Sequence, residues 1–249
     1  MSLNSPVLSS RSAEIVASFG ARAESYEFNA GLQKAIAARL ARFLPPLKRP
    51  KVLELGCGTG LFSRHLIERY PDGSFVLTDA SPAMLAECRR NLVGASGSRI
   101  DFGIMDASRP GGQGPFDLIA MSMALHWLPD QRASLERLRR LLAPSGVLLY
   151  AALGPETFAE WRAVLSEQGL PNGVAAIEAV PGVVHEERLA PDATALAFLR
   201  RMKSVGGLTP REDYRPLSPG ALRRAIHVAD ARGCPITWHI VYGRLAGTG

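Results

Sequence analysis

The stretch from Val52 to Gly60 constrains the fold of this chain more than any other part of it. It reads Val-Leu-Glu-Leu-Gly-Cys-Gly-Thr-Gly, an apolar, strand-forming run that breaks into alternating glycines, and a helical pattern follows from Leu61 to Tyr70. A glycine-rich turn between a strand and a helix lets backbone N–H groups approach a ligand closely, beside the positive end of the helix dipole. The sequence therefore predicts an α/β fold with a ligand site at this turn.

A second strand that ends in an acid follows the first helix. Ser74 to Asp79 reads Ser-Phe-Val-Leu-Thr-Asp, and a carboxylate in this position can hold ribose hydroxyls. The spacing Gly56-x-Gly58-x-Gly60 is shorter than the dinucleotide fingerprint G-x-G-x-x-G. Each signal has an ordinary alternative, since the glycines could simply pack tightly and Asp79 could be a turn residue. Their combination favours a nucleoside cofactor.

Length and composition limit the classes of protein to which this chain can belong. The chain has 249 residues, enough for one large α/β domain or for a core domain with a small cap. Its net charge of +6 comes without a basic run interleaved with aromatic residues, which disfavours nucleic-acid binding. No apolar run is long enough to span a membrane, and Met1 to Arg11 lacks a signal-peptide pattern. Cys57, Cys88 and Cys234 lie outside any metal-ligand spacing and suit a reducing cytosol. We therefore expect a cytoplasmic protein without a metal site. A monomer is also expected, although the sequence itself does not fix the oligomeric state.

Hydrophobic periodicity predicts alternating strands and helices after an unstructured segment 1–13. The predicted strands are 51–55, 74–78, 99–104, 116–121, 147–152, 182–189 and 236–245, and the predicted helices are 15–43, 61–70, 82–92 and 131–142, one more between Pro155 and Gly169, and two within 193–231. The connection 190–232 is longer than the last two strands need, and such connections usually carry structure or function. We expect it to form a helical lid within a single domain, 1–249.

Four motifs carry a resemblance to a known family. They are Glu-x-Gly-x-Gly-x-Gly from Glu54, Met105-Asp106-Ala107 at a strand end, Phe-Asp-Leu-Ile from Phe116, and Leu-Ala-Pro-Ser-Gly-Val-Leu-Leu from Leu142. With them the chain resembles the class I S-adenosylmethionine-dependent methyltransferases. The resemblance implies a Rossmann-like sheet of seven mostly parallel strands, with S-adenosyl-L-methionine as the cofactor and S-adenosyl-L-homocysteine as its product.

The same resemblance implies which residues contact the cofactor. N-terminal helices, residues 14–44, would cover it, and Tyr26 and Gln33 would close over it, although both side chains could instead cap the core. Met84 would pack on the adenine, and a Met is equally suited to filling the core. The other contacts that the resemblance implies are Glu54, Gly56, Cys57, Gly58, Gly60, Asp79, Ala80, Met105, Asp106, Ala107, Met121 and Ser122.

The segment Ser122 to Asp130 lies beyond the carboxyl end of a central strand, where ligands of open α/β sheets bind. Within it, His126 could be a general base or a polar contact. A carboxylate that accepts a methyl group is already anionic and needs no base, so a positioning role is favoured for His126. Trp127 is expected to form a wall.

Later motifs narrow the resemblance. Four further motifs resemble those of the malonyl-acyl-carrier-protein O-methyltransferases of early biotin synthesis. They are Phe19…Tyr26…Gln33, Ala124-Leu-His-Trp, the run from Leu199 to Gly207 and the run from Pro235 to Tyr242. That family usually has Gln at the position of His126. Two other enzyme classes stay open: arginine hydroxylases of the complex I assembly-factor type, and small-carboxylic-acid methyltransferases of the trans-aconitate type. A cofactor-binding scaffold without transfer activity also stays open.

The narrower resemblance implies that the carboxylate of malonyl-acyl carrier protein attacks the sulfonium methyl directly. Such a site mainly supplies approach and orientation, with a cation for the carboxylate. Arg201, with Lys203 as the alternative, is the candidate because both lie in the predicted lid, although both could be solvated surface residues. The acidic carrier would dock on surfaces that bear Arg139, Arg140 or Arg223.

Overall fold

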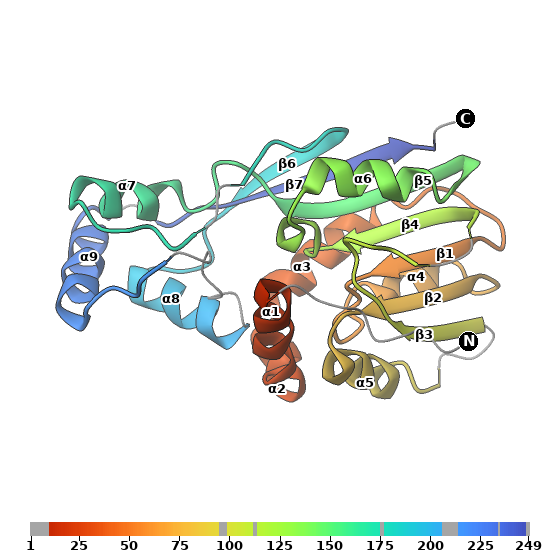
Figure 1. Ribbon diagram of the computed structural model, residues 1–249, viewed down its shortest axis with the longest axis horizontal. Coiled ribbons are helices and arrows are strands. Elements are labelled where there is room, and N and C mark those ends of the chain that lie inside the picture. The colour runs from red at the N-terminus through yellow and green to blue at the C-terminus, as the bar shows by residue number, and fades with distance from the viewer. Residues whose placement is uncertain are drawn as a thin grey trace.

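The computed structural model describes residues 10–94, 99–111, 114–174, 177–205, 214–233 and 235–247. A seven-stranded sheet organises them, in the order β3-β2-β1-β4-β5-β7-β6 (Figure 1). Its strands are β1 (Lys51–Leu55), β2 (Ser74–Asp79), β3 (Arg99–Ile104), β4 (Phe116–Ser122), β5 (Leu142–Leu153), β6 (Val183–Leu189) and β7 (Trp238–Ala246). Neighbouring strands from β3 to β5 pair in parallel, whereas β7 is antiparallel to β5 and β6. The predicted mostly parallel α/β sheet is confirmed.

Helices cover both faces of this sheet. They are α1 (Ser10–Gly20), α2 (Ala23–Asn29), α3 (Gly31–Ala41), α4 (Ser63–Arg69), α5 (Pro82–Asn91), α6 (Gln131–Arg139), α7 (Ala159–Glu167), α8 (Ala195–Ser204), α9 (Pro219–Ala231) and a short 3-10 helix, η1 (Leu125–Trp127). Successive strand residues point to opposite faces. In β1, Val52 belongs to the core that includes α3, α4 and α5, while Leu53 belongs to the core that includes α6.

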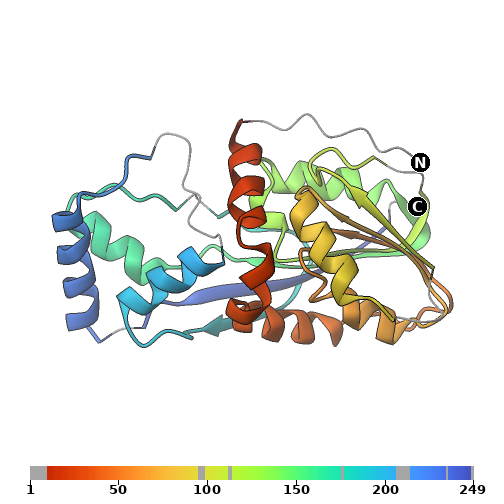
Figure 2. The same ribbon diagram turned by 90° about the horizontal axis from the view of Figure 1, so that it is seen from below.

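Three N-terminal helices replace the single helical segment that periodicity predicts. The breaks fall at Arg22 and Ala30, and α1 begins at Ser10, so the prediction of an unstructured segment up to residue 13 is wrong from Ser10 onward. Glu27 ties α2 to the sheet-covering helices, because its carboxylate accepts hydrogen bonds from Arg64 at 2.6 Å and from Asn91 at 3.0 Å. The two helices α1 and α2 lie between α8 and the sheet (Figures 1 and 2).

Helices α7, α8 and α9 pack together beyond one end of the sheet and form the helical unit of the fold (Figure 1). The core of this unit is aromatic. The ring of Phe158 lies 4.7 Å from the rings of both Phe198 and Trp238, and the ring of Trp161 lies 6.3 Å from that of Phe198. The predicted lid segment supplies α8 and α9, and it packs with α7, which precedes β6 in the chain.

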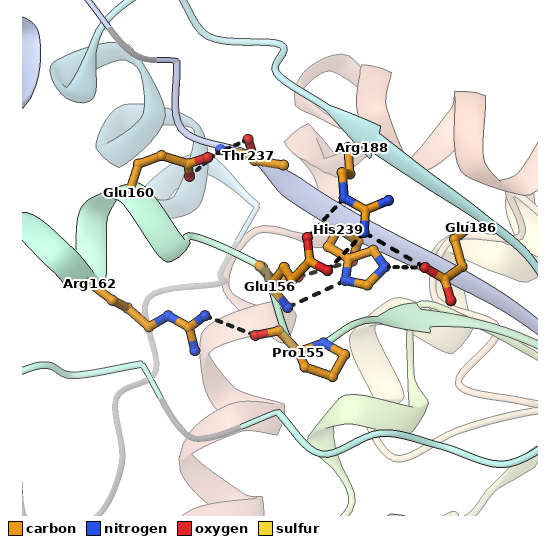
Figure 3. Close-up of polar contacts among 9 residues, drawn as sticks. Pro155, Glu156, Glu160, Arg162, Glu186, Arg188, Thr237 and His239 are labelled. Atoms are coloured by element: carbon orange, nitrogen blue, oxygen red, sulfur yellow. Dashed lines mark hydrogen bonds and ion pairs between the residues drawn. The ribbon is translucent and has the colours of Figure 1, made fainter. Parts of the chain in front are cut away.

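A polar network joins the helical unit to the sheet (Figure 3). Glu160 of α7 accepts hydrogen bonds from the backbone N–H and the hydroxyl of Thr237, at 2.9 and 2.7 Å. His239 accepts a hydrogen bond at Nδ1 from the backbone N–H of Glu156, so its Nε2 carries the proton and donates to Glu186 at 3.1 Å. These contacts fix the start of α7 relative to β6 and β7.

Some element boundaries differ from the prediction. The helix predicted over 131–142 ends at Arg139. The strand predicted over 147–152 begins earlier, at Leu142, and its pairing with β4 shifts between Phe116 and Leu118. The end of the motif from Leu199 to Gly207, residues 206–207, and Cys234 lie outside the described residues. Within the described ranges, no helix is both long and apolar enough to cross a membrane.

Candidate active site

The glycine turn begins where β1 ends. Gly56 and Gly58 have φ values of 68° and 55°, in the left-handed region that side chains disfavour. A Cβ atom on Gly56 would lie 2.6 Å from the Cβ of Ala124, whereas nothing lies within 4 Å of the corresponding point on Gly58. The turn therefore packs against the loop after β4 at Gly56 and leaves open space at Gly58.

Asp79 closes β2 beside this turn. Its carboxylate accepts hydrogen bonds from the backbone N–H groups of Gly58 at 2.9 Å and Ser81 at 2.8 Å. Burial raises the pKa of Asp79, while the backbone hydrogen bonds lower it. Because β1 and β2 are parallel neighbours, the sheet brings together the two strand ends on which the cofactor prediction rests.

Glu54 is fully buried beneath the turn. Its Oε2 accepts a hydrogen bond from the Ser63 hydroxyl at 2.6 Å, and its Oε1 has no partner within the described part of the chain. Burial raises the pKa of Glu54 to about 8, with Ser63 lowering it and Asp79 raising it further. The raised pKa favours the protonated form of Glu54 near neutral pH, and in that form the side chain can donate a hydrogen bond.

These strand ends form one wall of a cavity of about 170 Å³, the first cavity, which residues of α1, α2 and α3 also line. The predicted contacts that line it are Tyr26, Gln33, Glu54, Gly56, Cys57, Gly58, Asp79, Ala80, Met84, Met105, Asp106, Ala107 and Ser122. Acids at strand ends, open backbone at Gly58 and a thioether from Met84 fit an adenosyl cofactor. Buried oxygens of Glu54 and Gln33 that lack a described partner supply further polar groups for it.

Two of the predicted contacts, Gly60 and Met121, do not line the first cavity. Gly60 does not line the first cavity; it has a φ of 93°, and its N–H donates to the Cys57 carbonyl at 2.9 Å, so it shapes the turn. Met121 is fully buried in the core on the α6 face of the sheet, because its side chain points away from the cavity edge of β4. The positions of Gly60 and Met121 leave the position of the glycine turn unchanged.

A second cavity, of about 220 Å³, lies between the N-terminal helices and the helical unit. Its lining is mostly apolar and aromatic, and includes Phe158, Trp161, Phe198, Leu199, Met202 and Trp238. Met123 and Phe158, which both line it, have φ values of 57° and 59°. Left-handed backbone at residues other than glycine is strained, and such strain gathers at functional sites.

Five of the described residues line both cavities: Phe19, Tyr26, Gln33, Met123 and Trp127. We call them the shared wall. The ring of Phe19 lies edge-on to the rings of Trp127, at 5.4 Å, and Tyr26, at 6.3 Å. Burial raises the pKa of Tyr26 and the charge of Asp79 adds to this, so the hydroxyl stays protonated. The shared wall thus combines aromatic rings with a hydroxyl and an amide.

His126 lines the second cavity but not the first. Burial lowers the pKa of His126 to about 4, so the imidazole is neutral at neutral pH. Its Nδ1 has no hydrogen-bond partner among the described residues. A neutral imidazole with an open nitrogen can orient a polar group. Nowhere in the described ranges do three His, Cys, Asp or Glu side chains gather in a way that could hold a metal ion.

Arg201 and Lys203 line neither cavity. The Nε of Arg201 donates to both carboxylate oxygens of Asp192, at 2.9 and 3.0 Å. Asp192 exposes only 6% of its surface, so this ion pair belongs to the interior of the helical unit. The predicted role of Arg201 as a carboxylate clamp therefore finds no support in its position, and neither does the alternative at Lys203.

Sequence reasoning missed the aromatic lining of the second cavity and the strained Met123. One usable signal was present: the chain has 3 tryptophans, and Trp127, Trp161 and Trp238 all line this cavity. Only Trp127 was expected at the site. Trp161 and Trp238 fall within a predicted helix and a predicted strand, where aromatic residues usually pack in a core.

Comparison with known proteins identifies the family to which this chain belongs. Residues 53–148 match the family model described as a methyltransferase domain. The chain is 37% identical to the malonyl-[acyl-carrier protein] O-methyltransferase of Magnetococcus marinus, over 94% of this chain and 92% of that protein. This chain belongs to the malonyl-[acyl-carrier protein] O-methyltransferase family. The narrower of the two resemblances is thereby confirmed.

A second relative extends well beyond the region that matches this chain. The chain is 38% identical to the biotin biosynthesis bifunctional protein BioCD of Bordetella avium, over 96% of this chain and 53% of that protein, so it spans about half of this family relative. Among solved structures, phosphoethanolamine N-methyltransferase 2 of Haemonchus contortus, which was solved with S-adenosylhomocysteine, has a TM-score of 0.56 and 15% identity, over 98% of this chain and 61% of that one. That likeness concerns the fold alone and agrees with the seven-stranded sheet.

Proposed function

We propose that this member of the family uses S-adenosylmethionine to methylate the free carboxylate of malonyl-acyl carrier protein in early biotin synthesis. One observation carries the proposal: a cavity that fits an adenosyl cofactor adjoins an apolar cavity across the shared wall. The names of the relatives support the substrate. When bound, S-adenosylmethionine supplies an electrophilic methyl group on its sulfonium sulfur.

The residues of this chain bind, orient and exclude water. Asp79 and Glu54 hold the nucleoside end of the cofactor, where Gly58 leaves space for it. Gln33 and His126 orient the acceptor carboxylate, and Phe19 and Trp127 keep water away from the contact between donor and acceptor. The acceptor is an anion at neutral pH, so no residue has to remove a proton, and placing the two groups together accounts for the catalysis.

We further propose roles for the parts of this single domain. The N-terminal helices, 14–44, cover the first cavity, and the segment 190–232 acts as a lid over the second, since α8 and α9 contribute to its lining. Cys57 and Cys88 are buried and free, which supports a cytoplasmic location. Exposed Arg140 and Arg223 are candidates for carrier docking, whereas Arg139 is engaged with Glu136 and Ala246.

Intact-protein mass spectrometry tests the reaction. Purified protein is incubated with S-adenosylmethionine and malonyl-acyl carrier protein, and we expect the carrier to gain one methyl group on the malonyl half. Acetyl-acyl carrier protein, which lacks the free carboxylate, is the matched control and should gain none. Methylation of trans-aconitate in place of the malonyl carrier, or an arginine hydroxylation that requires iron and oxygen, would overturn the proposal in favour of one of the other two enzyme classes.

A further inference from the structure

Among the described residues that line the second cavity, one carries a formal charge. Arg11, in the first turn of α1, lines it, and no Lys, Asp or Glu is among the described residues that do so. Arg11 is only partly exposed, and it forms no ion pair with any described residue. A guanidinium that lies beside apolar walls, and has no carboxylate partner in the described part of the chain, is suited to an anion that comes from outside the chain.

Arg11 lies on the face of α1 that also carries residues lining the first cavity and the shared wall. Residues spaced by four lie on one face of a helix, so Arg11, Ile15 and Phe19 share a face of α1. Ile15 lines the first cavity and Phe19 belongs to the shared wall, while Arg11 lines only the second cavity. The positive charge therefore lies on the acceptor side of the wall and away from the cofactor.

We propose that Arg11 binds the free carboxylate of the acyl substrate and selects it over neutral acyl groups; this inference rests on the proposed function. The planar guanidinium pairs with a carboxylate through two parallel hydrogen bonds, and the low-dielectric walls strengthen the attraction. Methyl transfer converts the anion into a neutral ester, which can no longer form the ion pair. The ion pair thus holds the substrate, and its loss on methylation allows the product to leave.

The test compares Arg11→Gln and Arg11→Lys with Arg132→Gln, a control at an exposed Arg of α6 that lines neither cavity. The substrate is the malonyl thioester of N-acetylcysteamine, which has a carboxylate but neither phosphate nor carrier protein. Arg11→Gln is expected to raise its KM by about 10- to 100-fold, as the loss of a charged hydrogen bond does. Arg11→Lys should recover part of that loss, and the affinity for S-adenosylhomocysteine should stay unchanged in every variant.

A binding measurement keeps the inference testable without turnover. With S-adenosylhomocysteine present, calorimetry compares the malonyl thioester with its neutral methyl ester. Wild type and Arg132→Gln should prefer the anion, and Arg11→Gln should not distinguish the two. An unchanged preference in Arg11→Gln would overturn the role of Arg11, as would a defect seen only with carrier-bound substrate, which would place Arg11 at the phosphate of the carrier. Failure of the wild type to methylate any malonyl thioester would instead overturn the proposed function.

Discussion

The backbone N–H of Gly58 donates a 2.9 Å hydrogen bond to the carboxylate of Asp79. The bond joins the turn after β1 to the end of β2, two segments that are adjacent only because the strands pair in parallel. Ser81 donates to the same carboxylate at 2.8 Å and begins the cap of α5. Asp79 therefore fixes the shape of the pocket edge as well as offering a charge to the cofactor.

Replacement of Asp79 by Ala should weaken binding of S-adenosylhomocysteine by about 1–3 kcal/mol, the cost of losing charged hydrogen bonds. Isothermal titration calorimetry measures the affinity. Asp101→Asn, at an exposed position on the edge strand β3, is the control and should bind like the wild type. Equal affinities for the wild type and Asp79→Ala would remove Asp79 from the cofactor site.

Because of Glu54, the free energy of unfolding should fall as the pH rises. Burial raises the pKa of Glu54 to about 8 in the folded protein, above the ordinary value of about 4.3. Its contribution to stability is therefore full below the ordinary value and is lost as the pH rises toward 8. Relative to Glu54→Gln, the wild type should lose up to about 1.4 kcal/mol per pH unit in this window. Urea unfolding of both proteins without cofactor measures this, and parallel pH profiles would contradict it.

His126 should act without titrating near neutrality. Burial lowers the pKa of His126 to about 4, so kcat/KM for the malonyl thioester should show no inflection near the ordinary His value of about 6.5. His126→Gln, which installs the residue usual in the family, should keep most of the activity, since the amide can also orient a carboxylate. His126→Leu should lose about tenfold, roughly the value of one hydrogen bond. A large loss in His126→Gln would point to proton transfer.

Filling the second cavity should separate acceptor binding from cofactor binding. Leu199 of α8 lines this cavity, and Leu199→Trp is expected to block malonyl thioester methylation while leaving the affinity for S-adenosylhomocysteine unchanged. Leu196, on the same helix, is 41% exposed, so Leu196→Trp adds the same bulk outside the cavity. Steady-state kinetics should show a defect in the first variant alone. Normal turnover in Leu199→Trp would exclude this cavity as the acceptor site.

Most of the first cavity could be predicted from the sequence. Glu54, the glycines and Asp79 are signals that lie at strand ends, and parallel strand ends meet at one sheet edge. Gly60 and Met121 were also expected there but do not line the cavity, because a motif does not tell which way each of its side chains points. The role given to Arg201 found no support, since its pairing with Asp192 depends on how α8 packs.

The sequence alone determined the order of strands and helices, the glycine turn and the family, because these depend on local patterns of apolar residues, glycines and acids. The tertiary structure decided the acceptor side. Arg11, His126, Phe158 and Trp238 come from distant parts of the chain and meet only when the helical unit packs against α1 and the sheet. Packing also sets the pKa of Glu54 and of His126, because burial depends on neighbours that no local pattern specifies.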